Sequence, residues 1–161
     1  MQTLLPVAEA IAAKLKARGE TVSVAESSSG GLISAALLAV PGASAYFIAG
    51  GVVYTARARH RLLDIGKADV EGMRSSSEPY ALLLARTARS RMSADWGLSE
   101  TGAAGPSGNP YGDAAGHTCV AISGPIETVR TLETGDNDRP ANMRAFAHAA
   151  LTLLLDALES D

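Results

Sequence analysis

Apolar and polar positions recur in two periods along the chain, which predict a helix at each end and alternating strands and helices between them. Apolar residues repeat at helical spacing over 4–18, and Arg18-Gly19 supplies a basic last turn and a stop. The last helix is predicted to open at Pro140, with one apolar face reaching Leu158. Short apolar or β-branched runs predict strands at 21–25, 46–54, 94–99, 116–123 and 127–134. Further helices are predicted at 30–40, 55–63 and 79–92.

The order of these elements predicts the fold class. Strands that alternate with helices are typical of a sheet covered on both faces. The last two strands meet at Gly124-Pro125, which predicts a late antiparallel hairpin. We therefore expect an α/β fold, a three-layer α/β/α sandwich with a mixed, mostly parallel sheet. At 161 residues, the chain has the length of one domain, and we expect residues 1–161 to form it.

Composition narrows the classes of function. Hydrophobic residues make up 47% and charged residues only 19%, which excludes a disordered chain. The net charge of −3 and the aromatic content of 4% provide neither the basic surface nor the stacking platforms of a nucleic-acid binder. Cys119 is the only cysteine and the three histidines are scattered, so we expect no internal disulfide and no metal site. We also expect no cofactor.

Residues 27–56 contain no charged side chain, which superficially suggests a membrane span. Pro41-Gly42, Gly50-Gly51 and several serines interrupt this stretch, whereas a spanning helix needs about 20 mainly apolar residues without such breaks. The first residues also lack the basic segment and apolar run of a secretory signal. We therefore expect a cytoplasmic protein that does not contact a membrane.

A predicted strand runs directly into the serine- and glycine-rich segment 26–31 and then into a helix. The start of a helix exposes unpaired N–H groups and a partial positive charge, which suit a phosphate or the oxyanion of acyl transfer. A serine on this turn is then a candidate nucleophile. The same residues equally fit an ordinary helix cap with glycines for close packing.

Two later segments also allow both a functional and a purely structural interpretation. After Tyr54, a basic run could hold a phosphate or carboxylate, or form a solvated helix face; it contains Arg57, Arg59, His60 and Arg61. The segment 101–110 is rich in glycine and proline and fits either a ligand-binding loop or an ordinary surface loop. His117, at the start of a predicted strand, likewise fits either a structural or a site role.

Together and in this order, these segments resemble the CinA C-terminal domain family, also called the nicotinamide-nucleotide amidase family. Ala25-Glu26-Ser27-Ser28-Ser29-Gly30-Gly31 is similar to the family's Ala-Glu-Ser-Cys-Thr-Gly-Gly, and 54–59 to its Tyr-Ser-Asn-x-x-Lys. The segment 101–108 resembles Thr-Gly-Ile-Ala-Gly-Pro-x-Gly, and Gly135-Asp136 with Arg144 resembles the family's lead into the last helix. The resemblance extends over essentially the whole chain.

The resemblance implies hydrolysis of the carboxamide of nicotinamide mononucleotide to nicotinate mononucleotide and ammonia, without a metal. It implies that Ser27 is the nucleophile, and it places the family's base, a lysine, at Arg59. Arginine stays protonated in proteins and cannot take a proton from a serine. Tyr54 and His60 are the nearest substitutes along the chain. The alternative is a pyridine-mononucleotide-binding module that has kept the pocket and lost the base.

The resemblance therefore gives a defined set of expected site residues. We expect catalysis by Ser27, Arg59 and Tyr54, with Ser27 within hydrogen-bonding reach of Arg59 or of a water bound to it. The amides of 28–31 are expected to stabilise the oxyanion, and Arg59 and Arg144 to hold negative charge on the ligand. The residues expected to bind substrate are Glu26, Ser28, Ser29, Gly30, Gly31, Thr101, Gly102, Ala103, Gly105 and Arg144.

One further departure lies after the glycine-rich segment. Asp113-Ala114-Ala115-Gly116-His117 stands where the family has Lys-Pro-Val-Gly-Thr, which removes a cation. We expect a small-molecule nucleotide substrate, no nucleic-acid partner, and a homo-oligomer, namely a dimer. Members of the family are often fused to a larger nucleotide-processing domain, and we expect a stand-alone form here.

Overall fold

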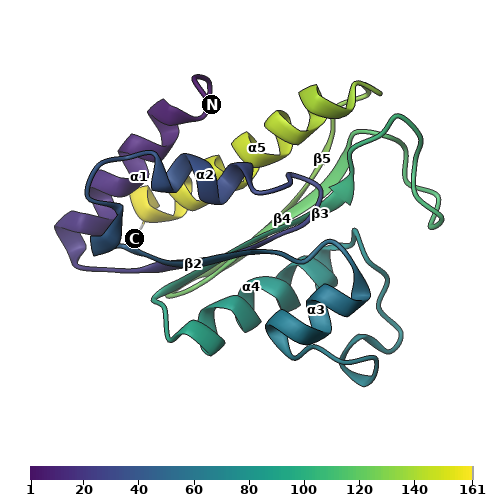
Figure 1. Cartoon of the computed structure of the whole chain (residues 1–161), viewed down its shortest axis with the longest axis horizontal. Coiled ribbons are helices and arrows are strands. Elements are labelled where there is room, and N and C mark those ends of the chain that lie inside the picture. The colour runs from purple at the N-terminus through teal and green to yellow at the C-terminus, as the bar shows by residue number, and fades with distance from the viewer. Residues whose placement is uncertain (161) are drawn as a thin grey trace.

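The computed structural model describes residues 1–160, which form a five-stranded sheet between two layers of helices (Figure 1). The strand order is β2-β1-β3-β4-β5; β2 pairs with β1 and β1 with β3 in parallel, whereas β3-β4 and β4-β5 are antiparallel. This confirms the expected α/β sandwich with a mixed sheet and a late hairpin. The strands are β1 (Val22–Glu26), β2 (Phe47–Val52), β3 (Trp96–Ala103), β4 (His117–Ser123) and β5 (Glu127–Glu133).

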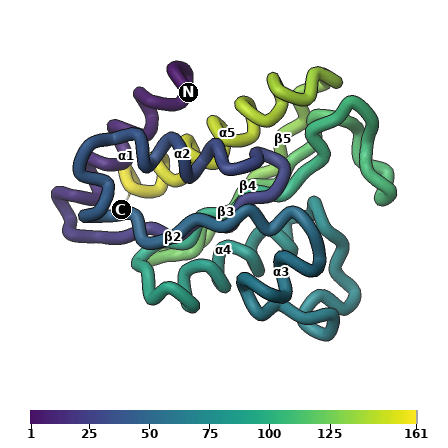
Figure 2. Tube along the Cα trace, viewed as in Figure 1, coloured from purple at the N-terminus to yellow at the C-terminus, as the bar shows by residue number. Residues whose placement is uncertain are grey.

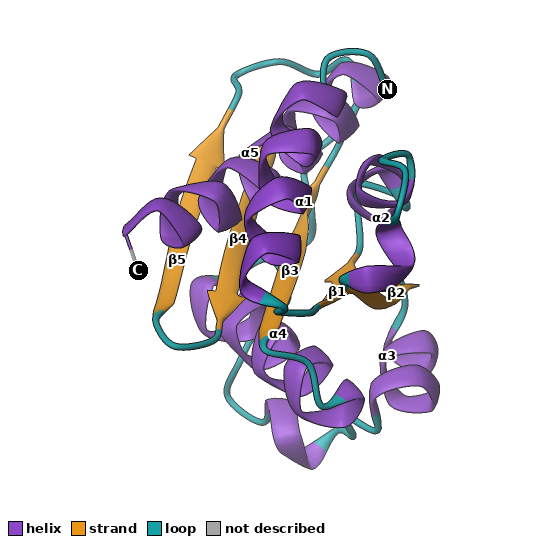
Figure 3. Cartoon of the chain, turned by 90° about the vertical axis from the view of Figure 1, so that its left-hand side faces the viewer, coloured by secondary structure: helices purple, strands orange, loops and turns teal. Residues whose placement is uncertain are grey.

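The helices divide between the two faces of the sheet. One face is covered by α1 (Leu5–Arg18), α2 (Leu32–Leu38) and α5 (Arg139–Ser160), and the other by α3 (Ala56–Leu63) and α4 (Glu78–Met92) (Figures 1 and 3). The chain trace shows that α1 and α5, from opposite ends of the sequence, lie side by side (Figure 2), and they are in contact. The larger apolar core fills the space between the sheet and this first layer.

The end of β3 differs from the sequence prediction. Thr101–Ala103 belongs to β3 and pairs with Cys119–His117 of β4, although the sequence predicts a loop from 101 onward. The glycine that suggests a loop is required by the pairing, because a Cβ at Gly102 would lie 2.4 Å from the carbonyl oxygen of His117. The structure also contains short 3-10 helices at Ala43–Ala45 and Ala68–Val70, which the sequence pattern does not predict.

A buried carboxylate joins β1 to α2. Glu26, the last residue of β1, is fully buried, and its two carboxylate oxygens accept hydrogen bonds from the first turn of α2 and from the residues before it. These contacts satisfy amides that have no partner within the helix, and they place a negative charge at its positive end. The donors, at 2.7–3.2 Å, are Ser29 Oγ, Gly31 N, Ile33 N, Ser34 N and Ser34 Oγ.

We expect Glu26→Gln to lower the free energy of unfolding by about 1–3 kcal/mol, because the new amide group would point N–H donors at donors. Urea denaturation measures this loss. Glu9→Gln, on the exposed side of α1, is the matched control and should stay within about 0.5 kcal/mol of the wild type. Equal losses in the two variants would show that the Glu26 carboxylate does not hold this junction.

Candidate functional site

A pocket of about 380 Å³ lies beyond the carboxyl ends of the parallel strands β1, β2 and β3. Ligand sites of parallel sheets form at this edge, and pockets for small molecules start at about 300 Å³. The pocket brings together residues from five separate segments of the chain. They are Ser27, Val53, Tyr54, Thr55, Ala56, Arg59, Ser75, Ser76, Tyr80, Thr101, Gly102, Asn109, Pro110 and Tyr111.

The pocket contains the three expected catalytic residues and two of the expected binding residues. Ser27 follows β1, Tyr54 and Arg59 follow β2, and Thr101 and Gly102 belong to the end of β3. No direct hydrogen bond joins Ser27 to Arg59 in the described part of the chain. Their contact through a water, and their catalytic roles, stay predictions.

The start of α3 presents Arg59 to the pocket. The helix begins at Thr55, whose Oγ1 accepts a hydrogen bond from Ala58 N at 3.1 Å. The Arg59 Nε donates to the carbonyl oxygen of Ile65 at 3.3 Å, and its guanidinium lies 5.9 Å from the centre of the Tyr80 ring. These contacts fix the stem of the side chain, and its two Nη groups have no protein acceptor within residues 1–160. Arg59 can therefore offer these donors to a ligand.

A second buried carboxylate, Glu100 of β3, holds the turn that carries Ser27. Glu100 Oε2 accepts the N–H groups of Ser27 and Ser29 at 3.1 Å and 2.8 Å. Glu100 Oε1 accepts the hydroxyls of Ser28 and Thr118. Glu100 is absent from the residues predicted for the site, although a charged residue directly after an apolar predicted strand, and directly before Thr101, is an available signal.

The same contacts occupy three of the four amides expected to form the oxyanion site. The amides of Ser29, Gly30 and Gly31 donate to Glu100, to the carbonyl oxygen of Ser27 and to Glu26, respectively, so these donors are already used inside the protein. The helix start does bind an anion, but the anion is the protein's own carboxylate. Of the residues expected to bind substrate, the following do not line the pocket: Glu26, Ser28, Ser29, Gly30, Gly31, Ala103, Gly105 and Arg144.

A different arginine of α5 lies near the pocket. Arg144 is exposed, whereas Arg139 donates from Nη2 to Tyr54 Oη at 3.1 Å and from Nη1 to the carbonyl oxygen of Gly105 at 2.6 Å. The sequence pattern places Arg139 in a turn before a helix that begins at Pro140, and this pattern does not indicate that Arg139 reaches Tyr54. His60, considered as a substitute proton carrier, is exposed and does not line the pocket.

Nowhere in residues 1–160 do three His, Cys, Asp or Glu side chains come together in a way that could hold a metal ion. The helices of that part of the chain are also too short or too polar to cross a bilayer.

Proteins similar to this chain are known both in sequence and in structure. A CinA-like protein of Anaeromyxobacter dehalogenans strain 2CP-1 is 41% identical over 150 residues, which cover 92% of this chain and 36% of that protein. The chain thus spans about a third of the length of the curated relatives it matches. The crystal structure of a competence/damage-inducible protein, CihA, from Agrobacterium tumefaciens matches with a TM-score of 0.88 and 30% identity over 97% of this chain and 95% of that one.

A CinA superfamily protein of Escherichia coli has a similar structure, with a TM-score of 0.89 and 26% identity over 96% of this chain and 90% of that chain. Residues 4–158, nearly the full length, match the CinA C-terminal domain. The chain therefore belongs to the CinA C-terminal domain family.

Proposed function

We propose that the pocket binds a pyridine mononucleotide and that Ser27 hydrolyses its carboxamide. The observation that carries the proposal is that Ser27 and Arg59, from segments far apart in the sequence, line one pocket. Ser27 Oγ would attack the carboxamide carbon, and the carbon–nitrogen bond would break as the nitrogen leaves with the serine proton as ammonia. Water would then cleave the acyl-serine ester to give the carboxylate and restore Ser27.

The side chains around the pocket support a flat, negatively charged ligand. Three of the chain's four tyrosines line it, namely Tyr54, Tyr80 and Tyr111, and tyrosine rings stack on heteroaromatic rings. Arg59 contributes one cation, and Arg139 contributes a second beside Tyr54. No carboxylate is among the lining residues, so charge-assisted contacts to a phosphate are not opposed by a like charge.

One observation favours a second candidate function, a module that binds the mononucleotide without hydrolysing it. The lining residues include no histidine, lysine, aspartate or glutamate that could accept the Ser27 proton. Arg59, where the family has its lysine, is a permanent cation of a kind that does not act as a base. The pocket therefore has a nucleophile and cations but lacks the usual groups for proton transfer.

The two candidates differ in what they predict for ammonia release from nicotinamide mononucleotide. We expect slow release by the wild type, none by Ser27→Ala, and a gain of roughly 10²–10⁴-fold in Arg59→Lys, because lysine restores a group that can act as a base. Arg57→Lys, exposed on the same helix and outside the pocket, is the control and should behave as the wild type.

Each other outcome has a distinct meaning. A fast wild type that Arg59→Lys slows would mean that another group carries the proton. Binding without hydrolysis in both proteins would establish the binding module. Absence of binding in both would exclude this substrate.

We also expect affinity to depend on the phosphate. Calorimetry should show the mononucleotide binding at least about tenfold more tightly than the riboside, because one charge-assisted contact contributes about 1.5–3 kcal/mol. Arg139→Gln should lose most of this difference and Arg144→Gln, the matched change on the same helix, should keep it. Equal affinities of the wild type for the two ligands would show that no phosphate site exists.

The expected compartment and assembly are separate from the chemistry. We propose a cytoplasmic protein and a homodimer, as expected from the sequence. Light scattering after size-exclusion chromatography measures the assembly, and a monomer at all concentrations would contradict it.

A further inference from the structure

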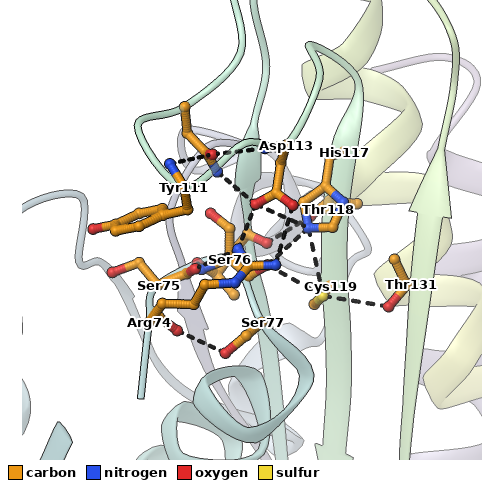
Figure 4. Close-up of polar contacts among 12 residues, drawn as sticks. Arg74, Ser75, Ser76, Ser77, Tyr111, Asp113, His117, Thr118, Cys119 and Thr131 are labelled. Carbon is orange, nitrogen blue, oxygen red and sulfur yellow. Dashed lines mark hydrogen bonds and ion pairs between the residues drawn. The ribbon is translucent and has the colours of Figure 1, made fainter. Parts of the chain in front are cut away.

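Behind one wall of the pocket, His117 is buried, and its ring points toward Ser76 and Asp113 (Figure 4). Nδ1 contacts the carboxylate of Glu133, its cross-strand partner on β5, and Nε2 lies 2.7 Å from the carbonyl oxygen of Ser76. A neutral imidazole carries only one N–H, and neither a carbonyl nor an ionised carboxylate can donate. Both nitrogens must therefore carry hydrogen, so the geometry fits the imidazolium cation.

The first wall segment that His117 holds is Ser75-Ser76. Ser76 has a φ of 57°, in the left-handed region that a non-glycine residue rarely adopts. Its N–H donates to Thr101 Oγ1 at 3.2 Å, and its carbonyl oxygen accepts from His117. Ser75, Ser76 and Thr101 all line the pocket, so this strained residue is fixed from both sides at the pocket wall.

The second wall segment is 109–111, held through Asp113. The Asp113 carboxylate receives two hydrogen bonds from Arg74, at 2.5 Å and 3.1 Å, and one from Asn109 Nδ2 at 2.8 Å. Asn109 Oδ1 accepts the N–H groups of Tyr111 and Asp113, and the Arg74 guanidinium lies 5.9 Å from the centre of the Tyr111 ring. Asp113 Oδ2 is 3.6 Å from His117 Nε2, so the imidazolium lies between the two segments.

We propose that the His117 imidazolium is a positioning residue, which holds segments 75–76 and 109–111 together as one wall of the pocket so that ligand affinity falls when the ring loses its proton. This proposal depends on the proposed function in one respect, namely that a ligand binds in this pocket. Without the proton, one ring nitrogen would turn a lone pair toward an oxygen, and that contact would become repulsive.

The surroundings set the pH at which the wall should loosen. Burial lowers the pKa of His117, but the hydrogen bonds with Glu133 and the Ser76 carbonyl outweigh it and raise the pKa above 6.5. Burial alone would raise the pKa of Asp113, but the hydrogen bonds from Arg74 and Asn109 have the larger effect, so the pKa of Asp113 is lowered overall. Burial raises the pKa of the Cys119 thiol. The groups that face or adjoin His117 are Glu133 of β5, Asp113, Arg74, Cys119 of β4 and Glu78 of α4, which accepts from Thr131.

The sign follows from these directions. Because the folded state raises the pKa of His117, the wall is fully held below about pH 6.5 and loosens as pH rises through the raised pKa. Asp113 stays ionised and Cys119 stays neutral over that interval. His117 is therefore the member of this cluster whose charge changes there.

A titration of the protein without ligand tests the wall directly. Nuclear magnetic resonance from about pH 5.5 to about pH 9 would follow the three histidine rings and the amides of Ser76, Gly102 and Tyr111. We expect both His117 nitrogens to carry hydrogen at the acid end, and the three amides to shift with the titration of His117. Amides that follow exposed His148, or do not shift, would overturn the proposal.

Two variants separate the roles of the two ring nitrogens. The Nε2 of His117→Gln can still donate to the Ser76 carbonyl, whereas His117→Asn keeps a donor only toward Glu133, and neither side chain titrates. The measurement is calorimetry with nicotinamide mononucleotide at about pH 6.5 and at about pH 8.5. The Gln variant should bind well at both pH values, and between them the wild-type affinity should fall about tenfold more than that of the Gln variant. The Asn variant should bind about tenfold more weakly at both, and His148→Gln should behave as the wild type.

The outcomes distinguish the wall from the proposed function. Identical pH dependence in the wild type and His117→Gln would overturn the positioning role. If the mononucleotide binds at no pH, the proposed function fails, and the titration alone decides the wall: amide shifts that follow His117 support it, and amides that do not respond overturn it.

Discussion

Two fully buried carboxylates, Glu26 of β1 and Glu100 of the adjacent strand β3, determine the turn that carries Ser27. No cation pairs with either one within residues 1–160; Glu26 accepts N–H and hydroxyl donors from the turn and α2, and Glu100 accepts them from the turn and β4. A buried charge is tolerated only with such a complete set of hydrogen bonds. The turn cannot rearrange without stranding one of the charges, so Ser27 is held in place relative to β3.

The same constraint limits the chemistry that the turn can perform. Because the amides of Ser29 and Gly31 already serve the two carboxylates, these two donors are not free for a ligand, and the proposed anion binding relies on side chains. Arg59 lines the pocket, and Arg139 donates to Tyr54, which also lines it, so these two guanidinium groups are placed for that role. The site therefore offers the proposed reaction a serine on a rigid turn and two guanidinium groups, but no histidine, lysine or carboxylate to accept a proton, which is why binding without hydrolysis is the second candidate function.

The element order could be predicted from periodicity, and the resemblance to the family predicted that Ser27, Tyr54 and Arg59 lie together. The structure gives the physical reason, because each of these residues follows a strand and parallel strands bring their carboxyl ends to one edge. Glu100, Arg139 and the partners of His117 could not be predicted in the same way. Their roles depend on which residue of one strand lies opposite which residue of another, as in the pairing of His117 with Glu133. Local periodicity carries no information about such a register, and the small residues at 101–103 conceal even the strand itself.

In the sequence, the departures from the family motif at 113–117 remove a positive charge. In the structure, positively charged side chains from other positions lie at the same place. Asp113 replaces a cation, but Arg74 brings a guanidinium to it from the segment before α4, and His117 adds an imidazolium that Glu133 accompanies. Two cations and two carboxylates thus face one another behind the pocket wall. Asp113→Lys alone would leave Arg74 facing a like charge, and His117→Thr alone would leave the Glu133 carboxylate and the Ser76 carbonyl without their donor. The cluster must therefore be understood as one unit, and a family role is better transferred to a place in the structure than to a position in the sequence.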